Sequence, residues 1–469
     1  MVSLGCPKNL VDSEVMLGIL ARQGYELTPR AEDAEVLIVN TCSFIDPAKR
    51  ESIDTILEMA ELKKSGRARR LVVAGCLVER YRKEILRDIP EVDYVIGTNE
   101  LERVLDACAF ESAGRESAEP IGPYLYHEFT PRVLSTPSYS AYLKIAEGCD
   151  HPCSFCVIPQ MRGRFRSRRF ESVIREVESL ARQGVGEVTL IGQDTTSYGE
   201  DLGLRDGLAK LLRELGKIDE LVWVRFLYCY PNRLTDALIS AVAETPRIAK
   251  YFDIPLQHAS ASVLKLMRRG SSGEHFLKML ERIRRAIPDV ALRTSFIVGF
   301  PGETEDDFKA LEDFVAAARF DHLGVFLYSN EETSGSYELP NQVQTRTAKR
   351  RQRELLALQQ KISRRKLSGK IGKRLPVLVE GRSEETDLLF AGRTEAQAPE
   401  IDGRVLINEF EGPEPAAGEF RCATVVGASD YDLIARLEAE TLAKRATGTR
   451  PPASPPHIVQ IQPAAPVGV

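Results

Sequence analysis

The sequence predicts an α/β chain in three parts: an N-terminal doubly wound α/β domain, a central incomplete (β/α)6 barrel and a small C-terminal β-barrel. Three observations carry this prediction. Three apolar runs near the N-terminus each precede a cysteine, six apolar runs alternate with amphipathic stretches between residues 137 and 340, and strand-like runs fill residues 375–426. Alternation of strands with helices is typical of parallel sheets.

The N-terminal domain is predicted over residues 1–110. Cys6, Cys42 and Cys76 follow apolar runs at residues 2–4, 36–41 and 71–75. Their spacing is close to the length of one βαβ unit, about 30 residues or more. The carboxyl ends of neighbouring parallel strands meet at one edge of a sheet, so the cysteines are expected to converge. Three unrelated buried cysteines are the alternative.

The central domain is predicted over residues 137–367. Its strands are expected at residues 142–146, 187–192, 222–228, 251–254, 292–298 and 323–328, with helices such as 171–183 between them. Ligands of parallel α/β folds collect outside the carboxyl ends of the strands. Here those ends carry GCDHPCSFC, IGQDTTSYG, YCYPNR, PLQHAS and GFPGET. Together these segments predict one functional site at the carboxyl end of the barrel, which we call the mouth.

The first of these segments contains a CxxxCxxC motif made of Cys149, Cys153 and Cys156. Three thiolates can hold three irons of a [4Fe–4S] cluster and leave the fourth iron open to another ligand. A structural zinc site, the main alternative, needs a fourth protein ligand. His151 lies inside the motif, where reaching back to the same metal is cramped. A disulfide is disfavoured because three cysteines cannot all pair and the chain carries no secretory signal.

This motif, with Phe155 just before its last cysteine, resembles the signature of radical S-adenosylmethionine (SAM) enzymes. The resemblance implies that the open iron chelates SAM and that Phe155 packs near the adenine. It also implies that Gly192 and Gln193 lie beside the SAM methionine, and that Ile297 and Gly299 belong to the strand that contacts adenine. An ordinary strand-to-helix turn also explains Gly299.

Two three-cysteine sets in this order resemble the methylthiotransferases, radical SAM enzymes that insert sulfur and add a methyl group. The resemblance covers residues 1 to about 437, including SLGCPKNLVDSE, NTCSFI, AGCLVERY, PLQHASASVLKLMRR and SFIVGFPGETE. It implies that Cys6, Cys42 and Cys76 hold a second [4Fe–4S] cluster for sulfur delivery. It also implies two SAM molecules per turnover and a low-potential electron donor such as a flavodoxin or ferredoxin. Radical chemistry belongs to the cofactor, and the protein supplies orientation.

The family divides into enzymes that modify tRNA adenosines and a branch that modifies an aspartate of ribosomal protein S12. The C-terminal domain, residues 368–437, resembles a TRAM domain. Residues 371–440 contain seven Lys or Arg against fifteen Asp or Glu. A tRNA-binding module is expected to be basic, whereas an acidic one suits a basic protein partner. A merely solvated acidic face is the alternative.

Two sequence motifs resemble those of the S12-modifying branch. They are CPKNLVDSE near the N-terminus and Ser429-Asp430-Tyr431-Asp432-Leu433 near the C-terminus. We therefore expect β-methylthiolation of an S12 aspartate, with tRNA adenosine methylthiolation as the alternative. Two stretches, residues 162–169 and 345–374, are rich in Lys and Arg. They either contact nucleic acid or form salt-bridged packing surfaces, and the sequence does not separate these interpretations.

Composition agrees with a cytoplasmic multidomain enzyme. The 469 residues are 43% hydrophobic and 28% charged, with a net charge of −5, and no apolar run approaches a membrane span. Cys108, Cys229 and Cys422 are expected to be structural. Residues 111–136 are predicted as a linker, residues 345–366 as a bridging helix, and residues 438–469 as a helical end with a disordered proline-rich tail.

Overall fold

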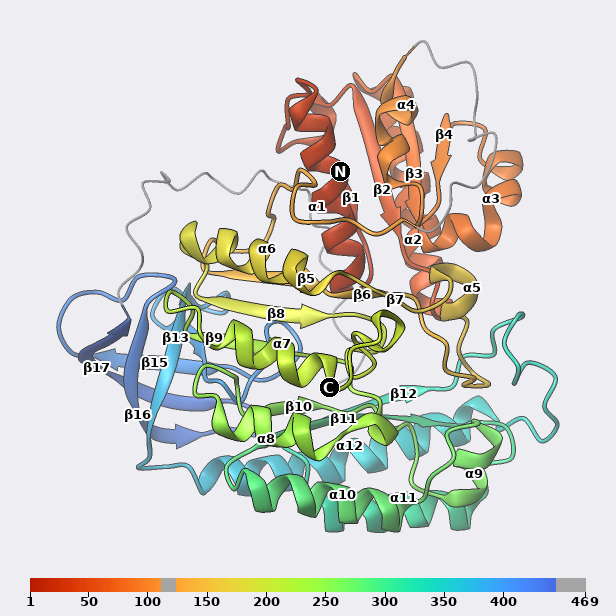
Figure 1. The fold of residues 1–469 in the computed structure, drawn as a ribbon. Coiled ribbons are helices and arrows are strands. Elements are labelled where there is room, and N and C mark those ends of the chain that lie inside the picture. The colour runs from red at the N-terminus through yellow and green to blue at the C-terminus, as the bar shows by residue number, and fades with distance from the viewer. Residues whose placement is uncertain (111–123, 444–469) are drawn as a thin grey trace.

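The computed structural model describes residues 1–110 and 124–443. In Figure 1 the N-terminal domain lies at the top, the central barrel below it, and the C-terminal barrel to one side. The predicted tail from residue 444 and the first half of the predicted linker, residues 111–123, lie outside the described residues. No helix in the described ranges is long and apolar enough to cross a membrane.

The N-terminal domain contains a parallel sheet with helices on both faces. Val11 and Val15 of one helix pack with Ile38 and Val72 on one face, while other helices pack on Val39 and Val73 of the opposite face. The predicted layering is confirmed, although the sheet order β1-β2-β3-β4 follows the chain without the reversal of a doubly wound sheet. The elements are β1 (Val2–Ser3), α1 (Pro7–Arg22), η1 (Ala31–Asp33), β2 (Val36–Thr41), α2 (Asp46–Ser65), β3 (Arg70–Gly75), α3 (Cys76–Asp88), β4 (Tyr94–Ile96), η2 (Leu101–Arg103) and α4 (Val104–Cys108).

The central domain is an open barrel of six parallel strands. The strands form two sheets, β5-β8-β9 and β10-β11-β12. The Cys229 N–H joins them by donating to the Asp253 carbonyl at 2.8 Å, and an isolated bridge pairs Val224 with Ile248. No pairing links β12 to β5 among the described strands, so the incomplete (β/α)6 barrel is confirmed. The strands are β5 (Ser140–Lys144), β8 (Glu187–Ile191), β9 (Trp223–Phe226), β10 (Tyr251–Asp253), β11 (Ala291–Val298) and β12 (His322–Leu327).

Amphipathic helices cover the outside of this barrel. Phe308 and Leu311 of α11 are buried against the sheet, and a capping box between Thr304 and Asp307 fixes where α11 begins. The predicted bridging helix exists as α12 and packs along β12 and α11. The other elements are β6 (Ala146–Glu147), α5 (Ile158–Arg162), β7 (Arg166–Ser167), α6 (Phe170–Arg182), η3 (Glu200–Leu202), α7 (Gly207–Leu215), η4 (Pro231–Arg233), α8 (Asp236–Glu244), α9 (Ala261–Leu266), α10 (Gly273–Ala286), α11 (Glu305–Ala318) and α12 (Thr345–Ser368).

The C-terminal domain is a closed five-stranded barrel in the order β13-β14-β15-β17-β16. Its strands are β13 (Arg374–Arg382), β14 (Phe390–Arg393), β15 (Val405–Phe410), β16 (Phe420–Ala428) and β17 (Leu433–Ala443). The predicted helical end is wrong for residues 438–443, which continue β17. Leu433, Ala435 and Leu437 alternate into the barrel core, and pairing with β15 and β16 overrides the helix propensity of the Leu-, Ala- and Glu-rich sequence.

The C-terminal domain closes the amino end of the central barrel. Arg393 forms an ion pair with Glu187, the first residue of β8, at 2.6 Å. The Tyr251 hydroxyl, at the start of β10, donates to Asp402 at 2.7 Å, and His322, at the start of β12, contacts the Ala396 carbonyl at 2.7 Å. The opposite end, where the strands finish, faces the N-terminal domain.

Candidate iron–sulfur and SAM site

The first cysteine set converges as predicted. Cys6 immediately precedes α1, Cys42 follows β2, and Cys76 begins α3. Gly5 has φ +88°, and a Cβ there would lie 2.6 Å from the Cβ of Cys42, so only glycine lets the two segments approach this closely. Burial, then the neighbouring thiols of Cys76 and Cys6, raise the pKa of Cys42 to about 12.

Asn9 ties the three cysteine-bearing segments together. Its Nδ2 donates to the carbonyl of Leu4 at 2.9 Å and to that of Thr41 at 2.8 Å. Its Oδ1 lies 3.7 Å from the Cys76 Sγ. The Nδ2 of Asn40 donates to the backbone carbonyl of Asn9 at 2.9 Å. These buried hydrogen bonds hold the three cysteine-bearing segments together.

The second cysteine set lies in the loop between β6 and α5. The Cys149 N–H donates to the Gly163 carbonyl at 3.2 Å, and the Cys156 N–H to the Cys153 carbonyl at 3.2 Å. Burial is the main reason that the pKa of Cys149 rises to about 11 and that of Cys156 to about 12, and the neighbouring Cys153 thiol adds to both. A thiol whose pKa is raised by burial ionises at neutral pH only when a cation, such as a bound metal centre, stabilises the thiolate.

Cationic and aromatic side chains surround this second set. Arg269 Nη1 lies 3.5 Å from Cys153 Sγ, and its guanidinium stacks over Tyr230 at 4.4 Å. The His151 ring stacks on the Tyr230 ring, with centroids 3.6 Å apart. Its Nε2 lies 2.6 Å from Asp194 Oδ2. His151 is thus held in place by Tyr230 and Asp194.

The sulfurs of the two cysteine sets do not form a compact site for a single metal ion. Within residues 1–110 and 124–443, neither cysteine set has its three sulfurs all within 4.8 Å of one another. Tetrahedral zinc with Zn–S bonds of about 2.3 Å requires sulfurs only about 3.8 Å apart. The wider spacing suits a polynuclear iron–sulfur cluster. In contrast, the ligand atoms of Cys422, Glu438 and Glu440 do lie within 4.8 Å of one another, but both carboxylates are engaged in ion pairs with Arg374.

The segment after β9 brings the two cysteine sets into one mouth. Lys8, two residues after Cys6, lies over the ring of Tyr228, whereas Arg269, which contacts Cys153, lies over the ring of Tyr230. Residues two apart in a chain are separated by at most about 7 Å between their Cα atoms. Cys76 also packs against Val157, which directly follows the second set. The structure therefore places the two sets next to each other where α3 meets α5.

A buried ion network fixes the N-terminal domain on the barrel at this point. Arg162 of α5 donates to Asn9 and pairs with Asp12 of α1 at 2.6 Å and with Glu147 at 3.3 Å. Lys144 of β5 pairs with Asp12 and, at 2.6 Å, with Glu147. Burial opposes ionisation of Glu147, but Lys144 and Arg162 lower its pKa to about 2. Burial raises the pKa of Cys76 to about 11, and Arg162 opposes this rise.

The structure gathers four of the five predicted SAM contacts near the second set. Phe155 and Ile297 join one apolar cluster. Gly192 lies against Ala146 of β6, and Gln193 Nε2 donates to Glu147 Oε1 at 2.6 Å. The Oε1 of Gln193 is buried and has no hydrogen-bond partner among the described residues, as expected of an acceptor that faces a ligand.

Gly299 differs from the other four. Its φ is +82°, and an added Cβ would lie 2.5 Å from the Cβ of Ala348 on α12. Its N–H donates to Glu303. The described contacts of Gly299 are therefore those of a packed turn.

Several residues of the site lie in motifs of the sequence without having been singled out as site residues. Lys8 and Asn9 lie within the CPKN motif, and Arg269 ends the segment PLQHASASVLKLMRR. Arg162 and Arg168 belong to the basic stretch and are buried in ion pairs with acidic residues, while Arg164 keeps 94% of its side chain exposed. The packing interpretation therefore holds for the buried arginines of that stretch.

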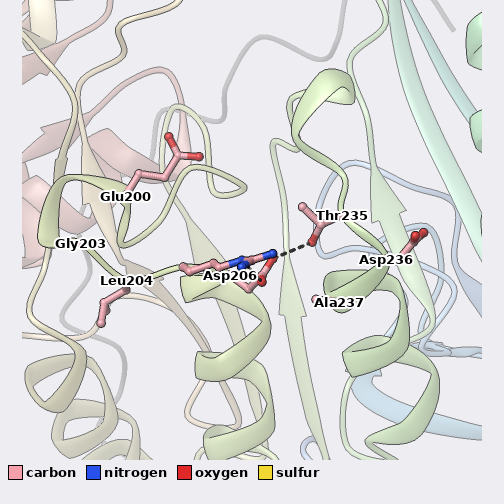
Figure 2. Close-up of a pocket in the computed structure, with 8 residues that line it drawn as sticks. Glu200, Gly203, Leu204, Asp206, Thr235, Asp236 and Ala237 are labelled. Atoms are coloured by element: carbon pink, nitrogen blue, oxygen red, sulfur yellow. Dashed lines mark hydrogen bonds and ion pairs between the residues drawn. The ribbon is translucent and has the colours of Figure 1, made fainter.

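A separate hollow of about 620 Å³ lies on the outer rim of the barrel, between the starts of α7 and α8. Figure 2 shows Asp206 and Thr235 facing each other across it, joined by a hydrogen bond of 3.1 Å. None of its lining residues belongs to the cysteine mouth. They are Glu200, Gly203, Leu204, Arg205, Asp206, Thr235, Asp236 and Ala237.

Comparison with known proteins agrees with this architecture. Residues 1–97 match Uncharacterized protein family UPF0004, residues 143–315 the Radical SAM superfamily, and residues 371–437 the TRAM domain. Among solved structures, the radical SAM methyltransferase TsrM from Kitasatospora setae has a similar fold, with a TM-score of 0.51 and 16% identity over 70% of this chain and 73% of that one.

Relatives that match nearly the whole chain are also known. A "Ribosomal protein uS12 methylthiotransferase RimO" from Solibacter usitatus is 61% identical, with 94% of each chain covered. The RimO of Koribacter versatilis is 56% identical, covering 93% of this chain and 95% of its own. Fold and site together define a radical SAM methylthiotransferase. The chain belongs to the RimO family of ribosomal protein uS12 methylthiotransferases.

Proposed function

We infer that this protein is a radical SAM enzyme that replaces a β-hydrogen of an aspartate in ribosomal protein uS12 by a methylthio group. The observation that supports this inference is that Tyr228 and Tyr230, two residues apart, each contact a cation that lies beside one of the three-cysteine sets, Lys8 and Arg269. The relatives with this chain's full architecture are named for the same reaction on uS12.

Within this function, Cys149, Cys153 and Cys156 would hold the SAM-binding [4Fe–4S] cluster, and Cys6, Cys42 and Cys76 a second [4Fe–4S] cluster. When bound, these groups supply the electron that cleaves SAM and the sulfur that is inserted. The chain's own residues orient and enclose them. Phe155 and Ile297 offer an apolar surface for adenine, Gln193 an unpaired acceptor, and Arg269 a cation beside Cys153. Gly192 would border the SAM methionine, and Gly299 would act indirectly by shaping the end of β11.

The reaction also requires reducing equivalents, so a flavodoxin or ferredoxin is the proposed electron donor. Because ribosomes assemble in the cytoplasm, the enzyme would work there, on free uS12 or on the small subunit. The acidic C-terminal domain supports a basic protein substrate.

Intact-mass analysis of uS12 from cells with and without this protein tests the inference. We expect uS12 to carry one methylthio group only when the protein is present. An unchanged uS12 mass, together with a lost methylthioadenosine in tRNA nucleosides, would favour the tRNA alternative.

A further inference from the structure

Lys8 is a buried cation that has no carboxylate partner in the described chain. It lies in the first turn of α1, two residues after Cys6, and is only 8% exposed. Its Nζ lies 3.2 Å from the ring centroid of Tyr228. No ion pair to Lys8 occurs within residues 1–110 and 124–443, and Tyr228 is its one assigned partner there.

The neighbouring buried cations of the same interface are all paired. Lys144 and Arg162 share Asp12 and Glu147, and Arg132 contacts Glu14 at 2.6 Å. A cation–π contact offsets only part of the cost of burying an ammonium group. Lys8 therefore stands out as a charge that an anion from outside the chain would complete.

The position of Lys8 defines where that anion would lie. Tyr228 has φ +64°, an unusual backbone conformation for a tyrosine, and its N–H donates to Asp253 Oδ2 at 3.0 Å. This fixes the ring beneath Lys8 at the carboxyl end of β9. Tyr230, two residues on, contacts Arg269, whose Nη1 lies 3.5 Å from Cys153 Sγ of the SAM-site set. Lys8 thus lies between the two cysteine sets.

We propose that the Lys8 ammonium binds the side-chain carboxylate of the substrate aspartate and so presents its β-carbon between the two sites. This rests on the function inferred above. The carboxylate stays intact in that reaction and is bonded directly to the reacting carbon, so anchoring it limits where that carbon lies. An adenine base carries no carboxylate beside its reacting carbon, so the same contact would favour an aspartate over an adenine at this position.

The alternative role for Lys8 is that of a counter-ion to the thiolates of the Cys6 set. Replacing Lys8 by a neutral residue distinguishes the two roles. Loss of a carboxylate anchor weakens binding of an aspartate substrate but not of its asparagine analogue. Loss of a counter-ion changes the second cluster itself, whatever the substrate.

The test uses anaerobically reconstituted full-length protein and two uS12 peptides that carry aspartate or asparagine at the modified position. In Lys8→Met, we expect KM for the aspartate peptide to rise roughly ten- to a hundredfold, and the affinity for the asparagine peptide to stay unchanged. Iron content and the electron paramagnetic resonance (EPR) signals of both clusters should match those of the unsubstituted protein. Lys8→Arg should retain a preference for aspartate, and Lys210→Met, an exposed change on α7, should alter neither peptide.

An equal change for both peptides, no change for either, or a shift of the second cluster's iron content or potential would overturn the proposal. Each of these outcomes leaves the unsubstituted protein methylthiolating uS12. Failure of the unsubstituted protein to modify uS12 would instead refute the inferred function.

Discussion

Arg269 places a positive charge beside the thiol of Cys153. Its Nη1 lies 3.5 Å from that sulfur while Tyr230 supports the guanidinium from one face. Hydrogen bonds and charge near cluster sulfurs stabilise the reduced state. The reduction potential of the SAM-site cluster should therefore depend on this residue.

We predict that Arg269→Met makes the potential of that cluster more negative by on the order of 100 mV. A redox titration followed by EPR measures the shift. Lys265→Met, an exposed change on the nearby α9, is the control and should leave the potential unchanged. Equal potentials for Arg269→Met and the control would show that Arg269 serves packing alone.

Gly299 allows a test of the close approach between β11 and α12. Gly299→Ala would suffer both left-handed backbone strain and a Cβ contact of 2.5 Å with Ala348. Gly203→Ala has a similar φ of +73° but no atom within 4 Å, so it isolates the backbone strain. We expect Gly203→Ala to cost about 1–2 kcal/mol and Gly299→Ala about 1–3 kcal/mol more.

Urea unfolding of both variants measures these costs. Similar losses in the two proteins would mean that the contact with α12 relaxes freely and that Gly299 is needed only for its backbone conformation.

At the scale of single residues, periodicity allowed the cysteines to be predicted but not their partners. Cys6, Cys42 and Cys76 follow successive apolar runs, so the strand pattern places them together. Arg162 meets Asn9 only because two domains pack against each other, and no local pattern records that contact. Gly299 was predicted at the SAM site, and the structure adds contacts with Glu303 and α12 that the sequence did not indicate.

At the scale of elements, α1 and β5 are joined by a buried ion network rather than by apolar packing alone. Lys144 of β5 lies between Asp12 of α1 and Glu147, and all three side chains are at most 4% exposed. Removing one member of such a network leaves buried charge without compensation. The attachment of the N-terminal domain should be sensitive to this residue.

We predict that Lys144→Met lowers the free energy of unfolding by about 3–5 kcal/mol. Urea denaturation of the full-length chain measures the loss. Lys278→Met, which breaks an exposed pair with Glu274 on α10, is the control and should change stability little. A similar small effect for Lys144→Met would contradict the account of this interface.

The element predictions succeeded where one face of a strand or helix is consistently apolar. All six barrel strands and the helix α12 were predicted to within a few residues. The end of β17 was not, because its residues favour helix locally and only the pairing with β15 and β16 selects a strand. The role of Arg393 and Asp402 at the amino end of the barrel likewise depends on domain packing.

At the scale of the whole molecule, charge is distributed unevenly. The C-terminal barrel carries most of the surplus acidity, including the exposed residues Glu409, Glu411 and Glu414 around the end of β15. Attraction between this domain and a basic protein would act over a Debye length of about 8 Å at physiological salt. Long-range attraction of this kind mainly affects association.

We predict that replacing these three glutamates by glutamine lowers kcat/KM for uS12 by about tenfold at low ionic strength, and that the difference disappears near 1 M salt. Steady-state kinetics at several salt concentrations measures the effect. Neutralising Glu26, Glu32 and Asp33, exposed acidic residues of the N-terminal domain, removes the same charge elsewhere. An equal loss in both triple variants would mean that net charge, rather than the C-terminal domain, attracts the substrate.

The central claim is that the two cysteine sets serve one reaction with separate tasks. The most direct measurement is product analysis of Cys42→Ser, in which 5′-deoxyadenosine and methylthiolated uS12 are quantified in the same anaerobic reaction. We expect this variant to cleave SAM to 5′-deoxyadenosine and to form no methylthiolated uS12. Methylthiolation of uS12 at the unsubstituted rate would contradict the claim.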